Sequence, residues 1–170
     1  IHVWRGEEPI VYRFGLEDLG SQPPSGPLLA YDFRRARAER VEASGAGPAW
    51  EVELEPRAWD YRILCPVLPG EIAIVGDVSR YVTAGDARLR DVRATGSGLA
   101  FEALGGPGER FEITGWSARP PRGARALDWS GERPLRVHYD GGLFRIPLQL
   151  EDRGWLRIQI DADSAEGGRR

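Results

Sequence analysis

Three glutamates occupy alternate positions in the segment 50–55: Glu51, Glu53 and Glu55. In an extended strand, alternate side chains share one face and lie about 6.6–7 Å apart, a separation of two carboxylates that suits an inverting glycosidase. The three other positions of the segment are apolar. Such alternation is typical of a half-buried strand, so we expect the glutamates to face water rather than to form a catalytic site.

Other residue types that commonly perform chemistry are few. The two histidines, His2 and His138, have no obvious nucleophile beside them, and Cys65 stands in the apolar run 63–67 without a paired histidine. No pair of histidines or cysteines has the spacing of metal ligands. We therefore expect an outward-facing His138, a buried and inert Cys65, no catalytic residue, no metal and no cofactor.

The six tryptophans are many for a chain of 170 residues. A tryptophan that points outward is either a platform for a sugar ring or a contact for a neighbouring domain. Trp50 shares the apolar side of its strand and is expected in the core. Trp155 falls on the polar side of its strand, and Trp116 and Trp129 flank an arginine-rich segment. These three are the candidates for carbohydrate or domain contact, and of the two roles we expect the domain contact.

The elements that must position these residues are short strands. Apolar and polar residues alternate in runs separated by Gly, Pro, Asp and Ser, with almost no helical periodicity. Strands are expected at 10–14, 28–33, 37–41, 50–55, 59–67, 72–75, 88–94, 99–104, 110–114, 135–139, 144–148 and 155–160. The pattern predicts an all-β fold, either one antiparallel β-sandwich or two small sandwiches packed together.

Glycine and proline mark the connections between the strands. The segment Asp140-Gly141-Gly142 predicts a tight hairpin with a two- to three-residue connection. The glycine-rich segments 96–98 and 105–108 join strand to strand, so we expect turns there rather than phosphate-binding loops. The segment 117–134 is rich in arginine and proline, and we expect a loop or an irregular edge strand.

The same pattern gives an expected domain organisation. We expect a first β-sheet unit at 1–69, a second β-sandwich unit at 70–160 and a disordered polar tail at 161–170. The sequence opens at Ile1 with a strand-like pattern instead of an initiator methionine. We therefore expect the chain to be part of a longer protein.

Charge and hydropathy exclude some classes of partner. The net charge is −3, and no basic stretch is interleaved with aromatic residues, which argues against nucleic acid. No window approaches the roughly 18–20 apolar residues of a membrane span, and no signal peptide opens the sequence. We expect neither nucleic acid nor a membrane as partner, and a cytoplasmic location.

Several segments carry a family resemblance. In chain order they are Tyr31-Asp32-Phe33-Arg34, Trp50 to Leu54, Trp59 to Pro66, Gly76 to Tyr81 with Ala87-Arg88-Leu89, Gly96 to Ala103, Arg119-Pro120 and Leu135 to Asp140. Over most of 28–160 they resemble the region that follows the catalytic barrel in the α-galactosidase clan. The raffinose synthase and alkaline α-galactosidase branch of glycoside hydrolase family 36 is the most similar. The last segment, for example, is similar to the family pattern val-x-phe-x-tyr-asp.

The resemblance implies a non-catalytic C-terminal accessory β-sandwich that packs against the catalytic barrel of the same parent chain. The catalytic aspartates of the clan lie on barrel strands, so none is carried over to this sequence. Two alternatives come from the residues themselves. One is a carbohydrate-binding module that uses exposed tryptophans, and the other is a small β-fold enzyme that uses the glutamate row. Of the three, we expect the accessory domain.

Overall fold

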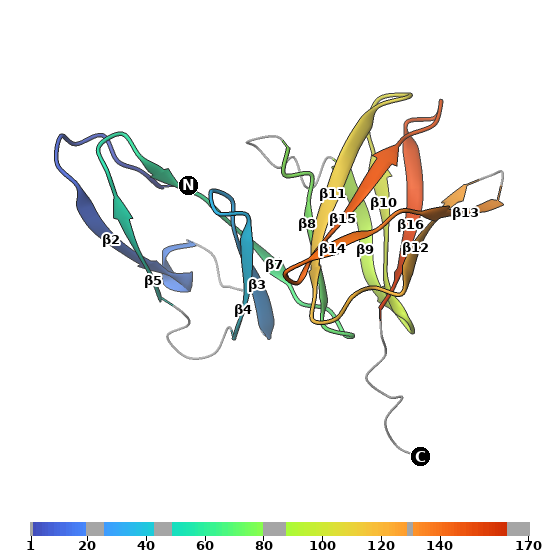
Figure 1. Cartoon of the computed structure of the whole chain (residues 1–170), viewed down its shortest axis with the longest axis horizontal. Helices are drawn as coiled ribbons and strands as arrows, with labels where there is room; N and C mark the ends of the chain where they lie inside the picture. Colours follow the sequence, from blue (N-terminus) through green and yellow to red (C-terminus); the bar gives the residue numbers. More distant parts are fainter. Residues whose placement is uncertain (1, 20–25, 43–48, 80–87, 129–130, 163–170) are drawn as a thin grey trace, which may run out of the picture. The chain divides into compact units, whose positions relative to one another are not determined.

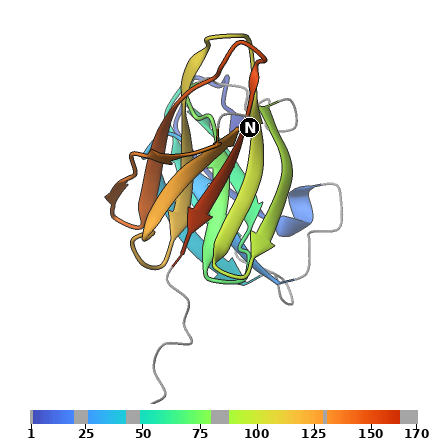
Figure 2. The same ribbon diagram turned by 90° about the vertical axis from the view of Figure 1, so that its right-hand side faces the viewer.

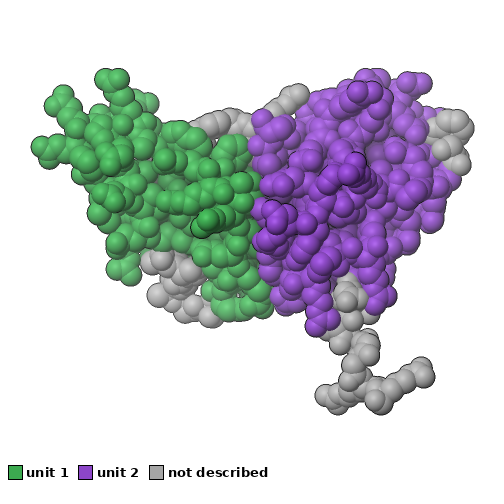
Figure 3. All heavy atoms as spheres, in the orientation of Figure 1, with its two compact units in different colours: residues 1–67 green, residues 68–170 purple. Residues whose placement is uncertain are grey.

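The computed structural model describes residues 2–19, 26–42, 49–79, 88–128 and 131–162 (Figure 1). All pairs between the strands of this part of the chain are antiparallel. The prediction of an all-β, antiparallel sandwich fold is therefore confirmed. The chain forms two compact units, unit 1 at residues 1–67 and unit 2 at residues 68–170 (Figure 3).

Unit 1 is built from short strands and one turn of 3₁₀ helix. Its elements are β1 His2–Val3, β2 Ile10–Gly15, η1 Leu16–Leu19, β3 Pro27–Asp32, β4 Arg37–Glu42, β5 Ala49–Leu54, β6 Trp59–Asp60 and β7 Arg62–Pro66. They form a β2-β5 ribbon, a sheet in the order β4-β3-β7 and a β1-β6 pair. The ribbon and the three-stranded sheet contribute to one apolar core, made of Phe14, Leu16, Leu28, Ala30, Trp50, Val52 and Leu54.

The register of β5 follows the alternation of its sequence. Trp50 and Val52 lie in the core, with Val52 only 3% exposed. Glu51 and Glu53 are exposed on the opposite face, and Glu55 just after the strand is exposed as well. The predicted core and solvent faces of this strand are therefore confirmed.

Unit 2 contains two larger sheets. Its strands are β8 Ile72–Gly76, β9 Leu89–Thr95, β10 Gly98–Leu104, β11 Arg110–Ser117, β12 Gly123–Asp128, β13 Gly131–Leu135, β14 His138–Asp140, β15 Leu143–Gln149 and β16 Trp155–Asp161. One sheet has the order β13-β12-β16-β10-β9 and the other the order β14-β15-β11-β8. Figure 2 looks onto the five-stranded sheet, with β9 in green at its edge.

Inward-facing residues of both sheets form a single core in unit 2. The fully buried members are Ile72, Leu99, Phe101, Ala103, Ile113, Ala126, Phe144, Ile146, Leu150, Leu156, Ile158 and Ile160. Two sheets that share one apolar core in this way make a β-sandwich. The alternation of apolar and polar residues along β10, β15 and β16 sets which side of each strand enters the core.

The hairpin between β14 and β15 has the predicted geometry. Asp140 pairs with Leu143, so the connection has two residues. These are Gly141 and Gly142, with φ of 57° and 86°. A two-residue turn with positive φ at both positions matches the twist of the flanking strands and favours glycine. The predicted tight turn is confirmed.

The interpretation of 117–134 as loop or edge strand is wrong for β12. This strand lies inside the five-stranded sheet, between β13 and β16. Its inward residues are Ala124 and Ala126, whose small side chains give a weak apolar signal in a segment dominated by arginine and proline. The prediction is correct for β13, which forms the edge of the sheet and carries Pro134.

The prediction of a disordered polar tail at 161–170 is wrong for its first two residues. Asp161 belongs to β16 and pairs with Gly98 and Gly123. Ala162 is buried, and its N–H donates to the carbonyl of Ser97 at 2.7 Å. The rest of the expected tail, 163–170, lies outside the described residues.

Candidate functional site

Trp155 is the best placed of the three candidate tryptophans. It opens β16, pairs with Leu104 on β10 and is half-buried. Leu156 and Ile158, whose side chains lie on the opposite side of β16, are fully buried. Trp155 therefore points away from the core of unit 2, as its parity predicts.

The other two candidates do not gather around Trp155. Trp116 lies on β11 in the four-stranded sheet, where it pairs with Leu143 and Ala73 and is half-buried. Trp129 lies outside the described residues. Trp116 and Trp155 belong to different sheets, so they do not form one aromatic platform.

The glutamate row is a solvated strand face. On β2, the residues opposite Glu51 and Glu53 are Arg13 and Val11, and Val11 is 65% exposed. A pair of catalytic carboxylates must flank a sugar from two sides of a cleft. Glu51 and Glu53 project instead from one strand of a two-stranded ribbon, with their side chains exposed to water.

His138 and Cys65 stand where the sequence predicts. His138 is exposed on β14, opposite Arg145. Cys65 is a buried free thiol, and burial raises its pKa to about 12 because the thiolate would lose its hydration. A thiol with such a pKa is not a nucleophile at neutral pH.

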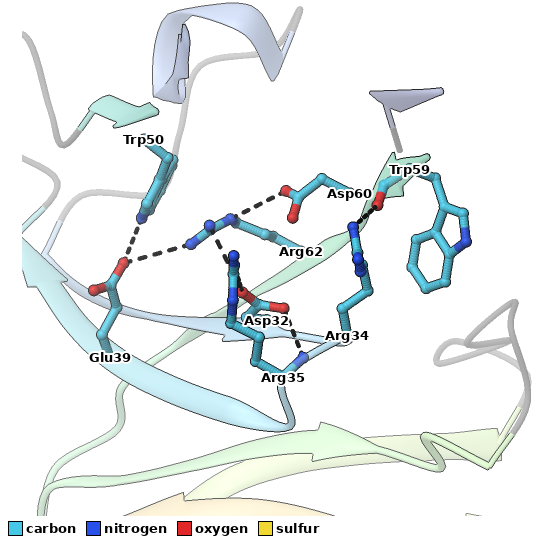
Figure 4. Close-up of polar contacts among 8 residues, drawn as sticks. All are labelled: Asp32, Arg34, Arg35, Glu39, Trp50, Trp59, Asp60 and Arg62. Carbon is cyan, nitrogen blue, oxygen red and sulfur yellow. Dashed lines mark hydrogen bonds and ion pairs between the residues drawn. The ribbon is translucent and has the colours of Figure 1, made fainter. Parts of the chain in front are cut away.

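A group of ionised side chains that sequence analysis missed surrounds Arg62 in unit 1 (Figure 4). The Arg62 side chain is 12% exposed, and its Nε lies 3.3 Å from Oδ2 of Asp60, which is 2% exposed. Its other nitrogens lie 3.8 Å from Asp32 Oδ2 and 3.7 Å from Glu39 Oε1. We call these four residues the Arg62 cluster.

Aromatic rings hold the guanidinium of Arg62 from the core side. Its central carbon lies 5.4 Å from the centre of the Trp50 ring and 5.6 Å from that of Phe14. Trp50 Nε1 also donates a hydrogen bond to Glu39 (Figure 4). A guanidinium stacks well on aromatic faces and cannot lose its proton in a protein, so Arg62 is a fixed positive charge at the end of the core.

Asp32 is held ionised by neighbouring arginines. Burial alone would raise the pKa of its carboxyl, but hydrogen bonds from Arg35 and the charges of Arg35 and Arg62 outweigh burial and lower the pKa below 3.8. Arg35 donates to Asp32 through its backbone N–H at 3.0 Å and through NH1 at 2.8 Å. A carboxylate held in this way cannot act as a general acid at neutral pH.

A second arginine cluster lies in unit 2. Arg88 is 12% exposed, with Nε 3.5 Å from Asp77 Oδ2 and NH2 2.6 Å from Glu109 Oε1. Its guanidinium covers the ring of Phe111 at 4.7 Å. As in the Arg62 cluster, one arginine contacts carboxylates that are distant from one another in sequence.

Ion pairs also cover the outward side of the five-stranded sheet. Arg157 NH2 donates to Glu102 Oε1 at 2.7 Å, and Arg125 NH1 donates to Asp161 Oδ2 at 2.9 Å. Gln159 Nε2 lies 3.3 Å from Asp161 Oδ1. Trp155 stands at one end of this polar surface, on the same side of β16.

One hollow of about 700 Å³ is lined by Gly108, Arg133 and residues 149–153. Arg133 reaches across it to the carbonyl of Gln149 at 3.5 Å. Within the described residues, none of the three charged side chains of the turn 151–153 is held in an ion pair.

The described residues hold no group of three or more His, Cys, Asp or Glu side chains that could bind a metal ion. Among their helices, none is long and apolar enough to cross a membrane. Neither a family model nor a curated protein matches the sequence. The segments named in the sequence analysis are therefore the sole basis for the resemblance to glycoside hydrolase family 36.

Proposed function

We propose that the chain is a non-catalytic accessory β-sandwich region of a carbohydrate-active enzyme related to the α-galactosidase clan. In this proposal the catalytic barrel belongs to the same parent chain, and this region packs against it. The non-catalytic role is supported by the residues that surround the buried carboxylates. In both units the buried carboxylates named above lie against an arginine that cannot lose its proton.

This arrangement opposes general acid–base catalysis. A catalytic carboxylic acid needs a pKa near the working pH, which proteins obtain by burying the carboxyl group away from cations. Asp32 lies beside Arg35 and Arg62 instead, and these two cations lower its pKa. The glutamates of β5 are exposed to water.

The order of motifs along 28–160 supports the link to carbohydrate-active enzymes. The structure is consistent with that link in fold class only, since many unrelated proteins are β-sandwiches. The enzymatic activity of the parent therefore needs a direct test.

The test compares two forms of the parent protein, the complete one and one that lacks residues 1–170. We expect the complete protein to hydrolyse an aryl α-galactoside. The shortened form should be less thermally stable, because it exposes the apolar surface that this region covers. A complete parent without activity on α-galactosides and other aryl glycosides would contradict the proposal.

A further inference from the structure

We propose that the outward side of the five-stranded sheet binds a neutral oligosaccharide along β16, between Trp155 and Asp161. We call this surface the β16 face. Its residues are Trp155, Arg157, Gln159 and Asp161 on β16, Glu102 on β10 and Arg125 on β12. The inference goes beyond the accessory role, and it does not depend on the activity of the parent.

Strand pairing sets the layout of the β16 face. Arg157 pairs with Glu102 on one side of β16, and Gln159 pairs with Arg125 on the other side. These cross-strand neighbours lie about 5 Å apart, and successive outward residues of β16 about 6.6–7 Å apart. The polar groups thus form consecutive rows across the sheet, with the indole of Trp155 at the end.

The length of the face favours an oligosaccharide over a single sugar. Six residue steps separate Trp155 from Asp161, which amounts to about 20 Å along an extended strand. This distance exceeds the size of one pyranose ring. A single sugar could therefore use only the indole or only the polar end, whereas a short linear chain would use both.

One position beside the polar groups is open. Gly123 pairs with Asp161, and a Cβ at Gly123 would have no heavy atom within 4 Å. The polar end of the face also borders a hollow of about 310 Å³, lined by Gly123, Ala124, Arg125, Glu132, Arg133, Pro134 and Asp161. A sugar ring there would lie against carboxylate and guanidinium groups that the sheet already holds in place.

The charges on β16, β10 and β12 are paired, which points to a neutral ligand on these three strands. Arg90 and Arg93 of the edge strand β9, which lie opposite Glu102 and Ala100, are not part of the face. Arg157 is neutralised by Glu102, and Arg125 lies against Asp161 and, at 3.5 Å, against Glu132. A phosphate or a nucleic acid would need arginines without carboxylates beside them. Neighbouring hydroxyl groups of a sugar can both donate to a carboxylate and accept from a guanidinium, so they fit paired charges.

The same pairs disfavour a protein domain as the occupant. Packing an apolar domain surface on the β16 face would remove water from the Arg157–Glu102 and Arg125–Asp161 pairs, and that desolvation offsets much of the gain from covering Trp155. A sugar keeps these groups hydrogen-bonded while its apolar ring face stacks on the indole. The structure therefore leads us away from the domain contact expected for Trp155 from the sequence.

The test is a titration of the purified chain, followed by the NMR signals of the tryptophan indole N–H groups and glutamine side-chain amides. The probes are glucose, cellotetraose, maltotetraose and stachyose. We expect a saturable shift at Trp155 and Gln159 with at least one tetrasaccharide and a weaker response to glucose. Trp155→Ala should lower the affinity by about tenfold, the size expected for loss of one aromatic contact.

Two variants serve as controls. Trp155→Phe keeps an aromatic ring and should retain part of the affinity. Arg145→Ala removes an ion pair of similar exposure, Arg145–Glu112 at 3.8 Å, from the four-stranded sheet and should leave the affinity unchanged. The backbone spectrum of each variant shows whether it is folded.

Two results would overturn the inference. One is the lack of a saturable shift with all four probes. The other is sugar binding that Trp155→Ala leaves intact. If the parent protein instead protects the Trp155 indole without any sugar, the face is a domain contact, and the inference is equally wrong. Turnover of a glycoside by the chain would bear on the accessory role but not on this binding site.

Discussion

Arg62 is the fixed positive charge that allows unit 1 to bury two carboxylates. Asp60 is 2% exposed and Asp32 is 9% exposed, and both lie within 4 Å of the guanidinium. Breaking a buried ion pair by removing one partner leaves an uncompensated charge. The stability of unit 1 should therefore depend strongly on this one side chain.

The first prediction concerns Arg62→Met, which keeps much of the apolar stem and removes the charge. The free energy of unfolding of unit 1 should fall by about 3 kcal/mol or more. The matched control is Arg34→Met, since Arg34 is exposed and, among the described residues, lies against the carbonyl and the ring of Trp59. This control should lose less than about 1 kcal/mol. Urea unfolding followed by the amide signals of β2 and β5 measures both, and equal losses would contradict the role of Arg62.

The second prediction concerns pH. The pKa of Asp32 is lower in the folded protein than its ordinary value of 3.8 in an unfolded chain, so the unfolded state binds the proton more readily. The stabilisation by Asp32 is therefore complete above about pH 4 and disappears as the pH falls through the lower folded-state pKa. Asp32→Asn should flatten this acid-side loss of stability, and Glu53→Gln should not. Identical pH profiles of Asp32→Asn and the unsubstituted chain would refute the assignment.

The third prediction tests the two faces of β5. Val52→Asp places a carboxylate without a partner in the core and should cost several kcal/mol, about enough to unfold unit 1. Glu53→Gln changes an exposed side chain and should stay within about 0.5 kcal/mol. The melting temperatures of the two variants test this prediction. Equal melting temperatures would mean that the register of β5 is inverted.

At the scale of elements, the β14–β15 hairpin depends on its glycines. Gly142 has a φ of 86°, and a Cβ at this position would lie 3.0 Å from Nε1 of Trp116. Gly142→Ala should therefore destabilise unit 2 by about 1–2 kcal/mol. Gly141 has open space around it and a φ of 57°, which asparagine tolerates, so Gly141→Asn should cost less. Chemical denaturation of unit 2 compares the variants, and the reverse order would contradict the turn geometry.

Sequence alternation located the strands whose inward residues are large. β15 and β16 present Phe, Leu and Ile to the core at every second position, which gives a strong period of two. β12 presents only Ala124 and Ala126 to the core. Their small side chains give a weak alternation, so the core side of β12 could not be recognised in a segment rich in arginine and proline. The side of β16 on which Trp155 lies was predictable, because the positions that alternate with it are strongly apolar.

The charge clusters were harder to predict, because their partners come from separate strands. Arg62 on β7 contacts Asp32 on β3 and Glu39 on β4. No local sequence pattern predicts these contacts. One local signal existed. Asp60 and Arg62 are two positions apart and precede Leu64 on the same side of an extended segment, and Leu64 packs against the core. Opposite charges on the core side of a strand predict a buried pair.

At the scale of the whole chain, each of the two β-units has its own apolar core and its own arginine cluster. In both units these charges stabilise the fold. The outward surfaces remain for binding, and among them the β16 face combines an outward tryptophan with rows of paired polar groups.

In the accessory role that we propose, the chain performs no glycoside chemistry of its own. The most direct test is an assay of the purified 170-residue chain on a panel of aryl glycosides that includes an α-galactoside. We predict release of the aryl group at the rate of buffer alone, for the unsubstituted chain and for Glu53→Gln alike. Turnover by the chain that Glu53→Gln abolishes would contradict the account, because it would make the glutamate row of β5 an active site.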